Sequence, residues 1–471
     1  MFQNKTFGTL FYLALGLVIW LSFLTPAIST PAAGQASKYF ANSSTRLVFD
    51  RPNLSPEAPS SALTIYVDKR ATGSETGADW VNAKTGLQDA LEIVTSGDQI
   101  WVATGIYTPT HQTLRSDTRT ATFSMSEGVK IYGGFNGNET SLTQRNWRAH
   151  PSILSGDLNG DDVVDSFTNN SENSYHVVTA AGILNTNTRL DGFTIQGGNA
   201  NGIGQHQFGG GLYNQPSTGS PSLVNLVFYK NFAEMGGGLY NVSSDALIVN
   251  AAWIGNKSDF GGGMRNYDSN VFLYNTLFVG NTSYTRGGAI YNSGSHPVFI
   301  NCTVAYNSAG ESAGGLLNDK DLTGTPSFNE FKNCIIWGNT PDQISNEVSP
   351  ASTTELYSTL IQGGCTGVGV SCFLAILDSD PLFIDPAGAD AIIGTQDDNF
   401  RLRTNSPAID KGENAAVPKD DLDINYNGNV TETLPLDLGD FRRFMGRGTP
   451  PRVDIGAYET KPTLFLPLIS K

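Results

Sequence analysis

The chain has 471 residues, of which 52 are glycine and only 15% are charged. The formal net charge of −15 excludes a nucleic-acid-binding protein, because phosphate contacts require a surplus of Lys and Arg, and it disfavours binding to anionic membranes for the same reason. Abundant glycine without a Gly-X-Y period favours an all-β protein with many tight turns.

The first 36 residues have the features of a secretory signal peptide. Lys5 precedes an apolar run from Phe7 to Leu24, and a stretch of small residues ends at Ala36, where we expect cleavage. The apolar run is longer than a usual signal core, so an uncleaved membrane anchor is the alternative. Both interpretations predict a secreted or cell-surface protein that meets the membrane only through its signal or anchor segment.

Residues 37–61 lack periodicity and read as a linker, so folding is expected to begin at residue 62. Alternating apolar residues predict strands at 64–68 and 98–103. Between them, residues 86–94 have helical spacing, and we expect this helix to cap the open end of a solenoid.

A repeat occupies the middle of the chain. Five glycine-rich units each end in an asparagine, and these asparagines are spaced 25 to 27 residues apart. The units are GGGLYN (209–214), GGGLYN (236–241), GGGMRN (261–266), GGAIYN (287–292) and AGGLLN (313–318). A second motif, with an asparagine at each end and an apolar residue midway, recurs in phase with the first; it begins at Asn225, Asn250, Asn275, Asn301 and Asn333. Two motifs in constant phase predict a solenoid.

The units contain short alternating strands separated by Gly, Ser and Asn turns, which favours a parallel β-helix over helix-pair repeats. We expect it to span 62–385, with its clearest repeats at 190–340. Equivalent residues of successive coils would stack about 4.8 Å apart. The repeated asparagines should therefore form hydrogen-bonded ladders, and Phe228, Trp253 and Phe278 should stack in the core.

Segments on both sides of the repeats carry recognisable motifs. They are IYVD (65–68), GDQIWVATGIYTPT (97–110), VKIYGGFNGNETSLTQRNW (129–147), ILSGD (153–157), YHVV (175–178), LDGFTIQGGNA (190–200), DPLFIDP (380–386), IGTQDDNFRLRTNSPAID (393–410) and VDIGAYE (453–459). These segments resemble the bacterial choice-of-anchor Q proteins. The resemblance implies a right-handed parallel β-helix of the pectin-lyase-like type at the cell surface, and it implies location and fold more firmly than activity. The GGG and FxxN units also resemble, more loosely, the adhesin-like repeats of polymorphic outer-membrane proteins.

The resemblance continues to the end of the chain, where residues 386–459 are expected to form an irregular C-terminal capping section. Residues 460–471 end in LFLPLISK, which resembles short Leu-Pro-Leu tails of bacterial surface proteins. This tail is too short to span a bilayer and has no LPxTG motif, so it predicts surface attachment or sorting without indicating the means.

All four cysteines lie in the second half and lack the CxxC spacing of zinc sites. In an exported chain, Cys365 and Cys372 are expected to close a small disulfide loop. Cys302 and Cys334 occupy matching positions in two repeats, where they either pair or stack as buried thiols.

Residues 157–165 resemble a calcium loop because oxygen-bearing side chains alternate along them. Asp157, Asn159, Asp161 and Asp165 are the candidate ligands, and calcium is the candidate cofactor. The position that is glycine in EF-type loops is occupied by Asp162, so a solvated acidic turn is the alternative. Residues 421–429 show the same alternation with fewer carboxylates and read equally well as a plain turn.

Counting back seven residues from each closing asparagine places Glu234 and Asp259 side by side on neighbouring coils. A retaining glycosidase requires two carboxyl groups about 5 to 5.5 Å apart, so this pair is the candidate catalytic site. Solvated carboxylates at a turn are the alternative reading. A lyase would also need a nearby base, and the repeat register positions neither Arg265 nor Arg286 beside the acids.

If the apolar residue of each glycine-rich unit points inward, the next residue points outward. The outward positions form a stripe of Tyr213, Tyr240, Arg265 and Tyr291, which is the candidate ligand-binding surface for sugars. The alternative is a set of aromatic side chains that cover the backbone.

The sequence as a whole favours an exported cell-surface β-helix scaffold that is adhesin-like or contacts glycans, without catalysis. A calcium-assisted polysaccharide lyase or glycoside hydrolase is the alternative, and a structural coat protein is the second alternative. The expected partner is a polysaccharide or cell-surface glycan.

Overall fold

The computed structural model describes residues 62–163, 165–347, 351–446 and 450–461. The expected signal at 1–36, the linker at 37–61 and tail residues 462–471 lie outside the described residues. Among the residues that are described, no helix has the length and apolar character needed to cross a bilayer.

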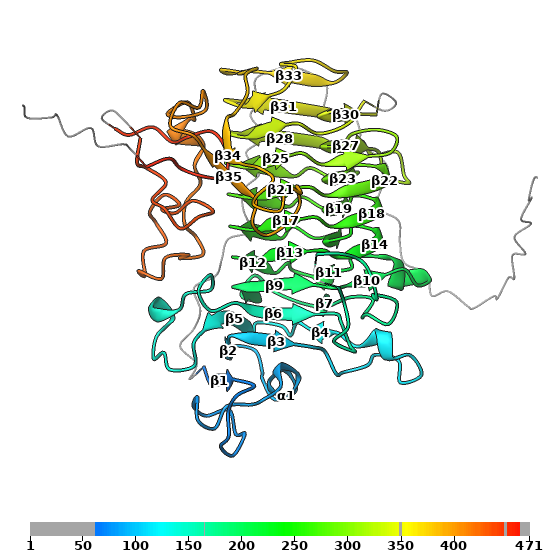
Figure 1. Ribbon diagram of the computed structural model, residues 1–471, viewed down its shortest axis with the longest axis vertical. Coiled ribbons are helices and arrows are strands. Elements are labelled where there is room, and N and C mark those ends of the chain that lie inside the picture. Colours follow the sequence, from blue (N-terminus) through cyan, green and yellow to red (C-terminus); the bar gives the residue numbers. More distant parts are fainter. Residues whose placement is uncertain (1–61, 164, 348–350, 447–449, 462–471) are drawn as a thin grey trace, which may run out of the picture. The chain divides into compact units, whose positions relative to one another are not determined.

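The chain winds into a right-handed parallel β-helix, as the sequence predicts, and four parallel sheets run along its coils (Figure 1). Sheet 1 contains β1 (Thr64–Val67), β2 (Gln99–Ala103), β5 (Lys130–Phe135), β8 (Arg189–Asp191), β12 (Ser222–Val224), β16 (Leu247–Val249), β20 (Phe272–Tyr274), β24 (Val298–Ile300), β28 (Phe328–Lys332), β31 (Thr353–Tyr357) and β33 (Val370–Cys372). Sheet 2 contains β3 (Gly105–Tyr107), β6 (Ser152–Ser155), β9 (Phe193–Gln196), β13 (Val227–Tyr229), β17 (Ala252–Ile254), β21 (Leu277–Val279), β25 (Thr303–Ala305), β29 (Ile335–Trp337) and β32 (Leu360–Ile361).

The other two sheets complete each coil. Sheet 3 contains β10 (Asn199–Ala200), β14 (Phe232–Met235), β18 (Lys257–Phe260), β22 (Thr282–Arg286) and β26 (Ser308–Ala309). Sheet 4 contains β4 (Phe123–Ser124), β7 (Val178–Ile183), β11 (Leu212–Thr218), β15 (Leu239–Val242), β19 (Met264–Tyr267), β23 (Ile290–Ser293), β27 (Leu316–Asp319) and β30 (Ile344–Asn346). One coil, from β12 to β15, therefore visits each sheet once.

Inward-facing apolar side chains of the coils form one continuous core. Phe228, Trp253 and Phe278 stack along it as the sequence predicts, with ring centroids 5.0 and 4.3 Å apart. Because each ring rests on the equivalent ring of the next coil, residues that repeat in the sequence make the same packing contacts in successive coils.

Three ladders of buried asparagines follow the turns, which confirms the structural reading of the repeated motifs. In the first, each side-chain amide donates to the next asparagine, so that Asn241 donates to Asn266 and Asn266 donates to Asn292, both at 2.8 Å. The second ladder passes through Asn256 and Asn281. The third lies between sheets 1 and 2, where its asparagines adopt positive φ angles. The ladders supply the hydrogen bonds that the buried turns would otherwise lack.

The glycine clusters allow neighbouring coils to approach closely. A Cβ atom on Gly237 would lie 2.5 Å from the carbonyl oxygen of Gly262 and 2.5 Å from that of Lys257. A side chain at this position would therefore force the coils apart.

The helix expected near the first coil is present but short. Helix α1 (Leu87–Leu91) buries Leu87, Ala90 and Leu91 against the first coil, in the same core as Val67. It lies at the blue end of the ribbon in Figure 1. The other helical elements are single 3₁₀ turns: η1 (Thr118–Thr120), η2 (Leu142–Gln144), η3 (Gly204–Gln207) and η4 (Asn414–Ala416).

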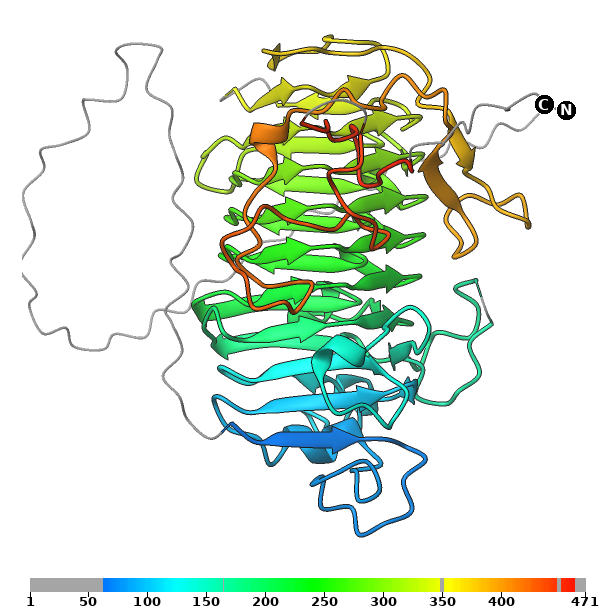
Figure 2. The same cartoon turned by 90° about the vertical axis from the view of Figure 1, so that its left-hand side faces the viewer.

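The described part of the C-terminal segment, residues 381–446 and 450–461, lies along the side of the coils (Figure 2), and the capping role expected for 386–459 stays a prediction. Apart from the antiparallel pair β34 (Phe383–Asp385) and β35 (Asn399–Leu402), its described part is irregular. It covers outward-facing apolar side chains of sheets 1 and 2, such as Val249 and Leu277. Burying these side chains explains why the segment folds back.

The cysteines divide into two pairs with different roles. Cys365 and Cys372 form a disulfide, as predicted. Cys302 and Cys334 are free, buried thiols stacked in the core of adjacent coils, so the stacking alternative holds for them.

Candidate functional site

The outer face of sheet 3 keeps its contact with solvent. The C-terminal segment packs on sheets 1 and 2, whereas Glu234, Lys257 and Asp259 on sheet 3 are only half-buried and Tyr284 is 54% exposed. These four residues form the sheet-3 face.

Glu234 lies directly opposite Asp259 on the neighbouring coil. Strand β14 pairs with β18 so that Ala233 aligns with Ser258 and Met235 aligns with Phe260. Ala233 and Ser258 point into the core, so the acids between these pairs point outward. Neighbouring strands lie about 4.8 Å apart. The register that the sequence predicts for the two acids is confirmed, while their catalytic role stays a prediction.

Tyr284 adds an aromatic ring to this face, and the sequence reasoning missed it. Ser283 aligns with Ser258, which places Tyr284 beside Asp259 on the next coil. Counting from Asn292 selects Thr285 instead, because an irregularity in the pairing of β18 with β22 inserts an extra residue. The Nζ atom of Lys257 lies 4.5 Å from the centroid of the Tyr284 ring.

The two arginines of the repeat are engaged elsewhere. The guanidinium of Arg286 pairs with Glu311 at 3.1 Å, and the hydrogen bond to Glu311 raises the pKa of Arg286. The guanidinium carbon of Arg265 lies 4.2 Å from the centroid of the Tyr291 ring. A guanidinium stays protonated in proteins, so neither arginine is prepared to take a proton from a substrate bound at Glu234 and Asp259.

The tyrosine stripe expected to bind sugars points away from the core, but it is covered. Tyr213, Tyr240 and Tyr291 are only 6, 6 and 7% exposed. Tyr240 stacks on Phe208 with centroids 4.9 Å apart and on Tyr213 with centroids 6.1 Å apart. The rings therefore shield the backbone of sheet 4, and little of their surface is left for a ligand. This corrects the expectation of an open stripe.

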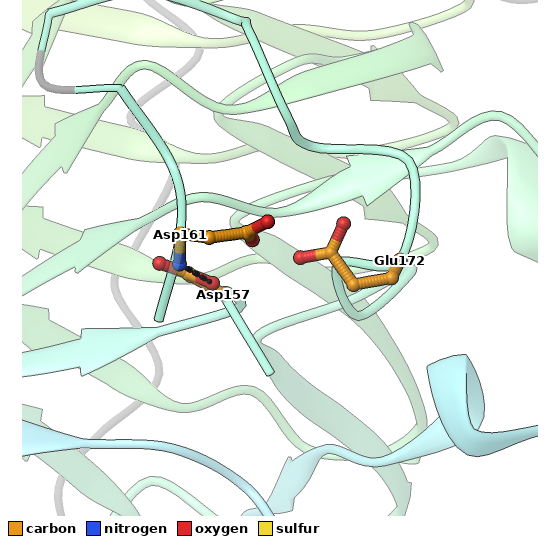
Figure 3. Close-up of side chains that lie close together, drawn as sticks. All are labelled: Asp157, Asp161 and Glu172. Atoms are coloured by element: carbon orange, nitrogen blue, oxygen red, sulfur yellow. Dashed lines mark hydrogen bonds between the residues drawn. The ribbon is translucent and has the colours of Figure 1, made fainter. Parts of the chain in front are cut away.

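The loop after β6 gathers three carboxylates. Figure 3 shows Asp161 and Glu172 directed toward each other, with Asp157 beside them; one oxygen of each lies within 4.8 Å of the others. Asp157 is held by the loop backbone, because its Oδ1 accepts hydrogen bonds from the Gly160 amide at 2.6 Å and the Asp161 amide at 3.2 Å.

One of the ligands predicted in this loop, Asp165, does not join the cluster. It accepts a hydrogen bond from the hydroxyl of Tyr229 on β13, while the role of Asn159 as a ligand stays a prediction. Glu172 takes part in the cluster, although no spacing in the sequence pointed to it. The loop folds back toward Asp157, and the carbonyl oxygen of Asn170 accepts a hydrogen bond from the side-chain amide of Asn199 at 2.6 Å. Because this contact joins residues that are far apart in the sequence, it leaves no short sequence motif that would predict a role for Glu172.

Several buried oxygens around this cluster have no hydrogen-bond partner within the described chain. They include Asp162 Oδ1, Glu172 Oε1 and Asn173 Oδ1. Burial, together with the nearby charges of Asp157 and Glu172, raises the pKa of Asp162 to about 6, although the hydrogen bond from Asn173 at 2.8 Å lowers it. Oxygen ligands with uncompensated negative charge fit a hard cation such as calcium.

The second acidic stretch, at 421–429, is a closed turn. Asp423 accepts hydrogen bonds from the amides of Asn427 at 2.9 Å and Gly428 at 3.0 Å. The side chains of Asn425 and Asn427 both donate to Glu432. Its oxygens are thus satisfied by the protein, which supports the plain-turn interpretation.

No family model and no curated protein matches the chain. Among solved structures, it is similar to pectate lyase Pel9A, with 13% identity over 85% of this chain and 97% of that one and a TM-score of 0.43. A rhamnogalacturonan lyase gives 13% identity over 73% and 97% with a TM-score of 0.33, and a pectin methylesterase from carrot gives 9% over 69% and 85% with a TM-score of 0.30. At these identities the likeness concerns the fold alone.

Proposed function

We propose that the protein is a noncatalytic β-helix scaffold that contacts a polysaccharide outside the cell through the sheet-3 face. The observation that carries the proposal is the column of Glu234, Asp259 and Tyr284 on three successive coils, on a face that the C-terminal segment leaves in solvent.

These side chains have the chemistry that sugars require. The exposed Tyr284 ring offers a flat apolar surface for the C–H face of a sugar ring. Glu234 and Asp259 accept hydrogen bonds from hydroxyl groups, and Lys257 beside the ring donates them. Because the coils repeat about every 4.8 Å, successive contacts follow an extended chain.

The noncatalytic interpretation rests on the surroundings of the two acids. Arg286 is ion-paired, Arg265 is stacked on Tyr291, and Lys257 lies with its Nζ atom 4.5 Å from the centroid of the Tyr284 ring, so each of these cations is already engaged. The alternative remains a calcium-assisted polysaccharide lyase or glycoside hydrolase that uses the same two acids, because neighbouring coils lie about 4.8 Å apart and a retaining mechanism needs carboxyl groups about 5 to 5.5 Å apart. A structural coat protein is the second alternative.

Location and family form part of the same proposal. The apolar run from Phe7 to Leu24 supports export, and the motifs from IYVD (65–68) to VDIGAYE (453–459) support membership of the choice-of-anchor Q proteins. An adhesin-like role at the cell surface follows from both, with residues 460–471 serving attachment or sorting.

A binding experiment on the exported chain tests the proposal. Retention on immobilised acidic and neutral polysaccharides would be measured for the wild type, Tyr284→Ala and the matched control Leu322→Ala, which removes another exposed side chain. We expect at least one polysaccharide to be retained, with about tenfold weaker binding for Tyr284→Ala, since one lost stacking contact is worth about 1 to 1.5 kcal/mol. Equal binding by all three proteins, or no retention of any polysaccharide, would refute it.

A further inference from the structure

A groove separates the outer face of sheet 2 from the C-terminal segment. It has a volume of about 450 Å³, within the range of small-molecule sites. Its floor consists of apolar side chains from three successive coils, of which Val227 and Ile254 keep exposed surface, while Ala252, Leu277 and Val279 are buried beneath. The remaining lining comes largely from Trp147 and from the C-terminal segment.

The wall of the groove presents polar groups with unused hydrogen-bonding capacity. Asp398 Oδ2 accepts hydrogen bonds from the amides of Gly394 at 2.7 Å and Thr395 at 3.3 Å, but its Oδ1 has only a long contact of 3.4 Å with the Thr395 hydroxyl. The amide of Gln396 is exposed and makes no hydrogen bond within the described chain. Burial, with the nearby charges of Asp397 and Asp390, raises the pKa of Asp398 to about 6.

Arg401 supplies a rigid donor at the same groove. Its guanidinium carbon lies 4.2 Å from the ring centroid of Phe441 and 4.8 Å from that of Tyr458, so the plane is held between two aromatic side chains. Its Nη1 atom is buried, has no hydrogen-bond partner within the described residues and lies 3.8 Å from Asp437, so the exposed part of the guanidinium is what can face the groove.

The charges that line the groove leave a negative surplus. Arg148 is neutralised by Asp440 at 2.6 Å, and Arg401 lies 3.8 Å from Asp437. Asp397 and Asp398 accept hydrogen bonds from backbone amides, which leave their negative charges in place. This surplus repels an acidic ligand and so favours a neutral sugar over an acidic one.

We propose that this groove binds a neutral sugar unit. A pyranose ring has an apolar C–H face that matches the floor and a rim of hydroxyls that matches Asp398, Gln396 and Arg401. The site is separate from the sheet-3 face and goes beyond the polysaccharide contact proposed there, because it would enclose one unit and not track a chain.

Titration of the full exported chain with small sugars tests this inference. The probes are neutral methyl pyranosides, with galacturonate as the acidic comparator, and binding is followed by saturation-transfer NMR and calorimetry. We expect a neutral pyranoside to bind at least tenfold more tightly than galacturonate. Asp398→Asn and Gln396→Ala should each weaken binding about tenfold. The matched control Asp390→Asn alters an exposed acid of the same loop that does not line the groove, and it should bind as the wild type does.

Each outcome is decisive. Absence of binding by every neutral probe, equal binding of galacturonate, or equal loss in Asp390→Asn and Asp398→Asn would overturn the inference. Gln396→Ala keeps the test valid if Asp398→Asn disturbs the loop, since Gln396 is exposed and unbonded. Tyr284→Ala should leave pyranoside binding unchanged while it weakens retention on polysaccharide, so failure of one proposal is distinguishable from failure of the other.

Discussion

Tyr426 donates its hydroxyl proton to Asp191 at 2.8 Å, across 235 residues of sequence. Asp191 is fully buried in β8 and also pairs with Arg145 at 2.7 Å and Arg189 at 2.5 Å. Asn225, a member of the third asparagine ladder, donates to the same carboxylate at 2.9 Å. The C-terminal segment is therefore joined to the β-helix by a buried charged network as well as by apolar packing.

Removing the central carboxylate should destabilise the protein strongly. Asp191→Asn leaves two buried guanidinium groups without their counter-charge, which costs about 3 to 5 kcal/mol. Tyr426→Phe removes the hydrogen bond to Asp191 and the acceptor for Arg145 and Arg189, and should cost at least about 1.5 to 3 kcal/mol. Urea denaturation measures both, and a loss below about 1 kcal/mol for Asp191→Asn would contradict the role given to this network.

The same network predicts how stability depends on pH. Burial alone would raise the pKa of Asp191, but the charges of Arg145 and Arg189 outweigh it and lower the pKa to about 2. The unfolded value is about 4, so this stabilisation is complete above pH 4 and is lost as the pH falls toward 2. Unfolding free energy measured across this range should fall less steeply for Asp191→Asn than for the wild type. Parallel curves would contradict the prediction.

Interrupting an asparagine ladder should be costly although the change is small. Asn266→Ala leaves the amide of Asn241 and the side-chain oxygen of Asn292 buried without their partner. We expect a loss of about 3 kcal/mol in unfolding free energy, because an unsatisfied buried polar group costs about 1 to 3 kcal/mol. The control Asn429→Ala, in an exposed turn, should cost less than about 1 kcal/mol. Similar losses in the two variants would show that the ladder adds little.

Calcium should raise the thermal unfolding temperature through the cluster of Asp157, Asp161 and Glu172. Glu172→Gln should abolish the increase, whereas Asp165→Asn should retain it, because Asp165 faces Tyr229. The increase should diminish below pH 6, where Asp162, with its raised pKa, becomes protonated in the folded protein. If Asp165→Asn abolished the increase and Glu172→Gln retained it, the ligand set predicted from the sequence, which includes Asp165, would be supported instead. If calcium had no effect on the wild type, a solvated acidic loop would be supported.

The sequence predicted the features that follow the repeat period and missed those that depart from it. The alignment of Glu234 with Asp259 follows from counting, because parallel coils convert a constant period into a constant register. Counting residues back from the asparagine of each unit did not select Tyr284, because one irregularity in strand pairing shifts the register at that position. Glu172 escaped because its loop closes through a distant contact with Asn199, for which no local spacing exists.

Burial was the other quantity that the sequence could not supply. Alternation correctly directs Tyr213 and Tyr240 away from the core, but it does not reveal that Phe208 stacks on the outside of the stripe. In the same way, the outward apolar residues of sheets 1 and 2 gave no sign that the described part of the C-terminal segment would return to cover them. Coverage depends on segments remote in sequence, which no repeat period encodes.

Parallel measurement of binding and product release on one polysaccharide tests the central claim most directly. The wild type, Tyr284→Ala and Glu234→Gln would be compared for the affinity of the intact polymer and for the appearance of new reducing ends or unsaturated products. A noncatalytic sheet-3 face predicts weaker binding in Tyr284→Ala and no product from any of the three proteins. Product formation by the wild type that disappears in Glu234→Gln would contradict the claim and establish Glu234 and Asp259 as a catalytic pair.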